Sequence, residues 1–271
     1  MIVPLSCERE KKERAERIEP EKYRESDGYP IDAFLDRLRD LCPGDDGGTG
    51  DDRARLAKKE AESAVVVARE LGLLKAEKEP WQVFRAANAD LHYGTEHAVE
   101  LDPIRSLVVK ITEPPKFGLI PKVVRHPVVD IRADSPGLDY REAIEFVAAT
   151  ASEYLDRWCA ANDVFSDSVR LAAVVAWPDG EVSFVITQPQ YHGKPAEPRE
   201  IEAYFCESAW RHVRDPSGQL SLFFNYGSGV LAVDAVPRNC YINDGRLQPF
   251  DVILCRPGAE LERYLRLYPD S

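Results

Sequence analysis

The sequence predicts an α+β fold in which two helices precede a region rich in β-hairpins. Apolar residues recur at steps of three and four in 31–41 and in 53–74, which is the spacing of helices that bury one face. Beyond Trp81, where the strand-rich region begins, short apolar runs separated by turn residues predict hairpins within 92–111 and 169–186. Helices and antiparallel hairpins that occupy separate stretches of a chain are typical of the α+β class.

Composition limits the classes of partner. The chain has 271 residues and a formal net charge of −12, which argues against a nucleic-acid partner and against an anionic membrane surface. It contains no run of 18 apolar residues, and its N-terminus is too charged for a secretory signal. Six scattered cysteines without a Cys-x-x-Cys pair argue against a zinc cluster or a disulfide framework, and therefore predict a reducing, cytoplasmic location.

Two parts are expected from the sequence. Residues 1–80 form a charged helical N-terminal extension with a Gly/Asp linker at 43–52, and the strand-rich region begins at residue 81. Residues 1–27, densely charged with few apolar anchors, are expected to be either a solvated helix or disordered. Further helices are predicted at about 140–161 and 197–213, and a short amphipathic piece follows at 259–267.

The stretch 230–254 carries the most informative polar residues. A strand ends at Asp234, a loop leads to Asn239, and an Asn-Asp-Gly turn at 243–246 sends the chain back to Asp251. That hairpin brings Asn239 and Asp251 together, and their oxygens suit Mg²⁺, while Asp234 can accept a proton from an attacking hydroxyl. The alternative is that these residues only shape turns, although a carboxylate inside the apolar run around Asp251 needs a partner or a metal.

Lys110 ends an otherwise apolar strand and needs an anionic partner, either a phosphate or a glutamate. The alternative is a lysine that extends to solvent from a strand edge. Two histidines, His92 and His97, flank the preceding loop, and lining a cleft explains them as well as a metal does.

In this order the motifs resemble the protein-kinase-like superfamily, and most closely the compact kinase-like domains of phage and mobile-element polyvalent proteins. The resemblance spans about 81–254. It comprises a Gly-x-Glu-His loop, the lysine strand, Phe-Gly, a helix, a linker, an Asp-x₄-Asn loop and a final aspartate. The residues are Gly94, Thr95, Glu96, His97, Lys110, Phe117, Gly118, Glu153, Gln188, Asp234, Asn239 and Asp251.

The resemblance implies a two-lobed kinase-like fold with ATP and Mg²⁺ between the lobes. Residues 81–187 would form the sheet-rich nucleotide-binding lobe, and residues 188–271 would form a compact, truncated C-terminal catalytic lobe. Gly94, Thr95, Glu96 and His97 would cover the nucleotide, Lys110 would hold its phosphates with orientation from Glu153, and the segment at Gln188 would meet adenine. Asp234 would be the catalytic base, assisted by Asn239, and Asn239 and Asp251 would bind the metal.

Several departures separate the chain from the family pattern. The nucleotide loop has one glycine, Ala232 stands where the usual histidine precedes the catalytic aspartate, and Val252 follows Asp251 in place of phenylalanine. No activation segment or peptide-docking helices fit after Asp251, so residues 1–80 are expected either to replace these parts or to hold a protein substrate or a partner.

An atypical phosphotransferase acting on a protein hydroxyl or a small molecule is therefore the main functional hypothesis. A nucleotide-binding interaction module with little turnover and an AMP transferase on the same fold are the alternatives.

Overall fold

The computed structural model describes residues 28–43, 50–129, 138–218 and 220–268. The charged segment 1–27 and residues 44–49 of the expected linker lie outside the described residues. The last residues assigned to that linker, 50–52, begin helix α2 instead.

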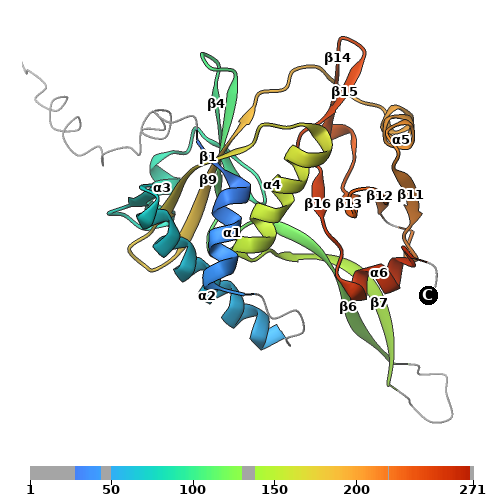
Figure 1. Ribbon diagram of the computed structural model, residues 1–271, viewed down its shortest axis with the longest axis horizontal. Helices are drawn as coiled ribbons and strands as arrows, with labels where there is room; N and C mark the ends of the chain where they lie inside the picture. The colour runs from blue at the N-terminus through green and yellow to red at the C-terminus, as the bar shows by residue number, and fades with distance from the viewer. Residues whose placement is uncertain (1–27, 44–49, 130–137, 219, 269–271) are drawn as a thin grey trace, which may run out of the picture.

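A seven-stranded sheet forms one side of the described molecule (Figure 1). Its order is β1-β8-β9-β5-β4-β3, with β2 also paired to β8, and every pairing except β2 with β8 is antiparallel. The strands are β1 (Tyr29–Pro30), β2 (Leu74–Ala76), β3 (His92–Tyr93), β4 (His97–Asp102), β5 (Leu107–Thr112), β8 (Arg170–Ala176) and β9 (Val182–Pro189). The two hairpins expected from the sequence, β4-β5 and β8-β9, are both present.

Two smaller sheets follow β9. The four-stranded sheet has the order β11-β12-β13-β16, and the three-stranded sheet has the order β10-β14-β15. Their strands are β10 (Lys194–Pro195), β11 (Arg211–Arg214), β12 (Ser221–Asn225), β13 (Val230–Val233), β14 (Cys240–Asn243), β15 (Arg246–Pro249) and β16 (Ile253–Cys255). Asn243 pairs with Arg246 across the Asp-Gly turn, which confirms the predicted hairpin.

Six α-helices cover these sheets in the described residues. They are α1 (Ile31–Leu41), α2 (Gly50–Glu70), α3 (Trp81–Ala87), α4 (Ala151–Phe165), α5 (Pro198–Glu207) and α6 (Ala259–Leu265). A mixture of helices with mainly antiparallel sheets confirms the α+β class.

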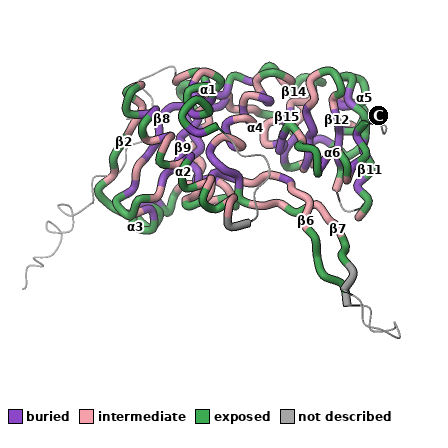
Figure 2. Tube along the Cα trace, turned by 60° about the horizontal axis from the view of Figure 1, so that its bottom comes forward, coloured by how far each residue is buried: buried purple, intermediate pink, exposed green. Residues whose placement is uncertain are grey.

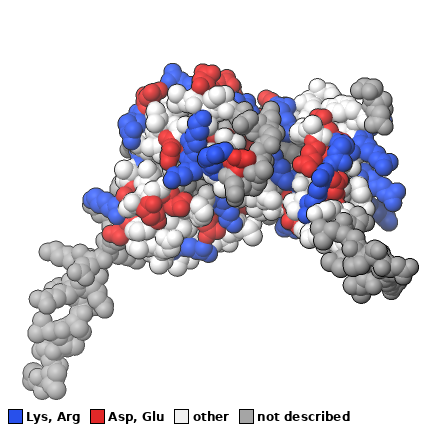
Figure 3. Space-filling model, turned by 90° about the horizontal axis from the view of Figure 1, so that it is seen from below, with Lys and Arg blue, Asp and Glu red and all other residues white. Residues whose placement is uncertain are grey.

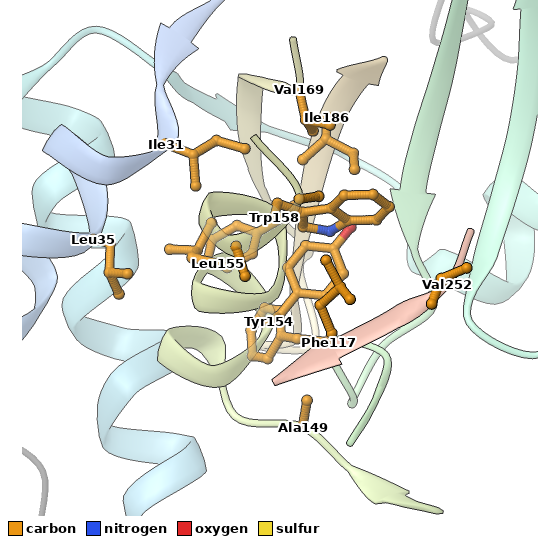
Figure 4. Packing of buried hydrophobic residues seen from close by; sticks show 14 of the residues in the cluster. Ile31, Leu35, Phe117, Ala149, Tyr154, Leu155, Trp158, Val169, Ile186 and Val252 are labelled. Atoms are coloured by element: carbon orange, nitrogen blue, oxygen red, sulfur yellow. The ribbon is translucent and has the colours of Figure 1, made fainter. Parts of the chain in front are cut away.

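Helix α4 lies at the centre of the main core (Figure 4). Its Tyr154, Leu155 and Trp158 pack between α1 and α2 on one side and the sheet on the other, and Val252 from the C-terminal part joins the same cluster. Residues 28–80 therefore do not form a separate extension, because they share the core of the sheet and add strands β1 and β2 to it.

A long two-stranded ribbon projects from this body (Figures 1 and 2). It consists of β6 (Leu119–Val129) and β7 (Leu138–Ala148), paired antiparallel along their length. The helix predicted at 140–161 is therefore wrong in its first half. The helix begins only after Thr150, which forms a capping box with Glu153, and Ile144 and Phe146 alternate as strand residues before it.

Other boundaries also differ from the predictions. The helix expected to reach Leu74 stops at Glu70, because Gly72 adopts a left-handed conformation at φ 71° and redirects the chain into β2. Trp81 begins the short helix α3 rather than a strand. The helix expected to continue to Val213 stops at Glu207, and Val213 pairs with Leu222 in a sheet.

Basic and acidic side chains are interspersed on the face seen in Figure 3. In the part of the chain that the structure describes, no helix has the length and apolar character needed to cross a membrane.

The sharing of one core predicts the effect of truncating α1. Phe34 is fully buried and meets the ring of Phe184 edge-on, with 6.1 Å between ring centroids. Phe34→Ala should lower the free energy of unfolding by about 3–5 kcal/mol in urea denaturation followed by circular dichroism. Leu41→Ala, at a half-exposed position of the same helix, is the control and should change it by less than about 0.5 kcal/mol. A separate early transition that leaves the main one unchanged would show that α1 folds apart from the sheet.

Candidate functional site

Lys110 lies in the middle of the main sheet on β5, between Val99 of β4 and Ile186 of β9. Its side chain is only 7% exposed, and its Nζ donates a hydrogen bond of 2.9 Å to Oδ1 of Asp251. The ammonium also lies 4.9 Å from the ring centroid of Trp158, which adds a cation–π contact. The lysine therefore does not extend to solvent from an edge. It points to the place where the C-terminal part meets the sheet.

The carboxylate of Asp251 also lies near a second cation, the guanidinium of Arg157. Nη2 of Arg157, from α4, lies 3.6 Å from the same oxygen, Oδ1, that accepts from Lys110. Burial alone would raise the pKa of Asp251, but the charges of Lys110 and Arg157 outweigh burial and hold that pKa below its usual value. Asp251 is therefore an ionised carboxylate at neutral pH, and 41% of its side chain is exposed.

Asp234 and Asn239 form a tight loop directly after β13. Asp234 adopts a left-handed conformation at φ 61°, which turns the chain away from the strand, and the 3₁₀ turn η2 (Pro237–Asn239) follows. Nδ2 of Asn239 donates to the backbone oxygen of Asp234 at 2.8 Å and to its Oδ2 at 2.9 Å. Arg238 donates from Nη2 to both carboxylate oxygens at 2.7 Å. The loop thus holds Asp234 by local contacts.

The predicted hairpin brings this loop to Asp251. The amide of Phe250 donates to the backbone oxygen of Asn239 at 3.0 Å, which places Asn239 opposite the residue before Asp251. The amide nitrogen of Asn239 donates both of its hydrogen bonds to Asp234. Its side-chain oxygen can therefore accept a hydrogen bond or bind a metal.

One amide oxygen and one carboxylate suit Mg²⁺, which commonly keeps several of its waters. Among the described residues, no group of three or more His, Cys, Asp and Glu side chains is placed to hold a metal, so any metal here would be bound by this smaller set together with water.

Gln188 is buried at the end of β9 and acts as a connector. Its Nε2 donates to Oδ2 of Asp167 and to the backbone oxygen of Phe250, both at 2.8 Å. The hydroxyl of Tyr191 donates to the other oxygen of Asp167 at 2.6 Å. The Gln188 side chain is therefore committed to internal hydrogen bonds and fixes the peptide that precedes Asp251, and the contact of the backbone at Gln188 with adenine stays a prediction.

The loop between β3 and β4 contains the other predicted nucleotide contacts. Gly94 and Thr95 are exposed, and the Gly94 amide donates to the backbone oxygen of His97 at 2.9 Å. Glu96 points inward, where its Oε2 lies 2.6 Å from Nη1 of Arg157. Contacts of these residues with a nucleotide stay predictions.

His97 is buried, and its Nε2 lies 2.9 Å from the hydroxyl of Tyr154. Burial, together with the nearby positive charge of Lys110, lowers its pKa from 6.5 to about 3. His97 is therefore a neutral imidazole in the folded protein. His92, in contrast, is exposed on β3, so the two histidines differ in environment.

Glu153 does not orient Lys110. It accepts from both Nη atoms of Arg53 at 2.9 and 2.6 Å, and its Oε1 lies 3.0 Å from Nζ of Lys122. Burial alone would raise its pKa, but the hydrogen bond from Arg53 and the charge of Lys122 lower it to about 2. Its position in the first turn of α4, where Thr150 caps the helix, makes Glu153 part of the helix start and separates it from Lys110.

Sequence reasoning missed Arg157 and Arg238. Nothing in the sequence marks Arg157 as buried, because an arginine on an amphipathic helix is usually solvent-exposed. Arg238 could have been noticed from its place directly before Asn239, within the same short loop as Asp234.

No protein-family model matches the chain, and no curated protein and no solved structure matches it significantly.

The buried neutral imidazole predicts a pH dependence of stability. The pKa of His97 is lower in the folded protein than in the unfolded chain, so its contribution is present above pH 6.5 and is lost as the pH falls toward 3. His97 alone should therefore remove about 2 kcal/mol between pH 7 and pH 5. His97→Gln keeps a hydrogen-bonding group but cannot titrate. In urea unfolding at pH 7 and pH 5, its free energy of unfolding should therefore fall by about 2 kcal/mol less than that of the parent protein. His92→Gln, which deletes an exposed imidazole, is the control. An unchanged slope in His97→Gln would contradict the assignment.

Proposed function

We propose that the chain is an ATP- and magnesium-dependent phosphotransferase of the protein-kinase-like type, acting on a hydroxyl of a protein or a small molecule. The observation that carries the proposal is the contact of Lys110 with Asp251 beside the Asp234–Asn239 loop. The sequence predicted one site from four residues that lie on three segments. Lys110 lies on β5, Asp234 and Asn239 lie on the loop after β13, and Asp251 follows the β14–β15 hairpin.

The order of elements supports this proposal. In protein kinases the phosphate-binding lysine lies on the third strand of the sheet, and the metal-binding aspartate follows the catalytic loop. Here Lys110 lies on the third strand of the run β3-β4-β5, the β6–β7 ribbon and helix α4 separate this run from β8, and Asp251 follows the Asp234–Asn239 loop through one hairpin. The two-lobed kinase fold is part of the proposal.

Each residue then has a chemical role. Lys110 binds the phosphates of ATP, exchanging its contact with Asp251 for one with the nucleotide. Asn239 and Asp251 would hold Mg²⁺, which would supply positive charge against the negative charge of the phosphates. Asp234 accepts the proton of the attacking hydroxyl as the phosphate is transferred.

Arg238 does not prevent this role of Asp234. The side chain of Arg238 is 71% exposed, and exposed ion pairs contribute only about 0–1 kcal/mol. A substrate hydroxyl can therefore displace the guanidinium from one carboxylate oxygen at small cost. Asn239 meanwhile continues to hold Oδ2 of Asp234 through its amide.

Two isosteric substitutions test the assignment. Asp234→Asn cannot accept a proton, so it should leave binding of Mg·ATP nearly intact and slow ADP formation by about 10²–10⁴-fold. Asp251→Asn removes a charge from the metal site, so it should weaken magnesium-dependent ATP binding and turnover together. Thermal shift with Mg·ATP measures binding, and ADP release with autophosphorylation of Ser, Thr or Tyr measures turnover.

Asp244→Asn is the matched control, because Asp244 lies exposed on the turn of the same hairpin and asparagine tolerates its positive φ of 49°. Both activities of this variant should equal those of the parent protein.

The products of the parent protein distinguish the alternatives. Release of pyrophosphate together with incorporation of AMP would show that the chain transfers AMP and not phosphate. Binding of Mg·ATP without ADP or pyrophosphate, equal in all variants, would favour a nucleotide-binding module. Absence of any Mg·ATP effect on the parent protein would contradict the proposed function.

A further inference from the structure

Arg157 connects two parts of the proposed site that are far apart in the chain. It lies on α4, is 3% exposed, and stacks over Trp158 with its Cζ 5.0 Å from the ring centroid. Its Nη1 lies 2.6 Å from Oε2 of Glu96 on the β3–β4 loop, and its Nη2 lies 3.6 Å from Oδ1 of Asp251. One guanidinium therefore contacts the carboxylates of two segments that have no sequence proximity.

We propose that Arg157 is the positioning residue of the nucleotide site, holding the metal-binding carboxylate of Asp251 and, through Glu96, the loop that covers the phosphates. This role rests on the proposed function. It also assigns to helix α4 a cation at the place where protein kinases use a helix glutamate to orient the lysine.

The contacts at Asp251 explain how positioning works. Nζ of Lys110 donates to Oδ1, and Nη2 of Arg157 lies 3.6 Å from the same oxygen, whereas none of the described residues forms a hydrogen bond with Oδ2. The hydrogen bond from Lys110 and the charge of Arg157 act on the same oxygen, so they favour one rotation of the carboxylate and leave the other oxygen to face a metal. Partners that orient a metal ligand in this way change metal affinity by about 10–100-fold when they are removed.

The surroundings of Glu96 are closely packed around its ion pair with Arg157. Oε2 of Glu96 also accepts from the amide of Leu119 at 3.3 Å. Gly118 has a positive φ of 102°, and a Cβ there would lie 2.7 Å from Oε2 of Glu96 and 3.1 Å from the ring of Tyr154. The backbone after β5 is therefore shaped around the Glu96–Arg157 pair, which accounts for the glycine at 118.

The charge of the cluster also favours this role. Lys110 and Arg157 balance Glu96 and Asp251, so Lys110 can turn to a phosphate while Arg157 continues to neutralise Glu96. Lysine at 157 would keep the charge but not the planar fork that lets arginine reach two carboxylates at once. The two substitutions therefore separate charge from geometry.

The test compares Arg157→Gln and Arg157→Lys with Arg53→Gln in the full-length protein. Arg53→Gln removes one of the two cations that pair with Glu153 on the same helix without touching Asp251, so it controls for loosening of α4. Binding of a fluorescent ATP analogue is titrated with Mg²⁺. Arg157→Gln should raise the magnesium concentration for half-maximal binding by about 10–100-fold, and Arg157→Lys should restore it only in part. Arg53→Gln should lower the melting temperature and leave that concentration unchanged.

A magnesium requirement of Arg157→Gln equal to that of Arg53→Gln would overturn the positioning role while leaving the proposed function intact. A parent protein that binds no nucleotide at any Mg²⁺ concentration would instead overturn the proposed function, and this role with it. If Arg157→Gln does not fold, Glu96→Gln provides the second variant, because it frees the guanidinium from one carboxylate at constant volume. Its magnesium requirement should rise as well, and an unchanged value would overturn the proposal.

Discussion

The ion pair between Lys110 and Asp251 is the contact on which the arrangement of the described chain depends. It joins residues 141 positions apart, one in the middle of the main sheet and one after the last hairpin. An ammonium that is nearly removed from water needs an anion beside it, so β5 and the Asp251 segment must meet. Arg157 and the cation–π contacts with Trp158 complete the same polar cluster inside the core.

Helix α4 transmits this constraint to the rest of the molecule. One face carries Tyr154 and Trp158 toward the sheet and the charged cluster, while Leu155 joins the core with α1 and α2. The start of α4 is fixed by Arg53 and Glu60 of α2, since Glu60 accepts from the Ser152 amide at 2.7 Å. The N-terminal helices thus belong to the scaffold of the site.

Local turn chemistry made part of the site predictable. The Asn-Asp-Gly turn specifies the β14–β15 hairpin, and that hairpin alone brings Asn239 to the residue before Asp251. The charge partner of Lys110 was not predictable in the same way. Glu153 pairs with Arg53 and Lys122, and the positions of these two cations, which leave Asp251 as the partner of Lys110, follow only from the tertiary structure. Strand β7 from residue 140 onward was mistaken for the start of a helix because its apolar residues satisfy both periodicities, and only strand pairing decides between them.

The proposed function depends on one site that includes both the lysine strand and the Asp234–Asn239 loop. A crystal structure of the protein with Mg²⁺ and a non-hydrolysable ATP analogue tests this directly. The account predicts a metal bound by Asn239 and Asp251, with the phosphates against Lys110 in place of its contact with Oδ1. Crystals grown with saturating analogue that show the Lys110–Asp251 contact intact and no nucleotide beside it, or a nucleotide bound elsewhere, would contradict the account.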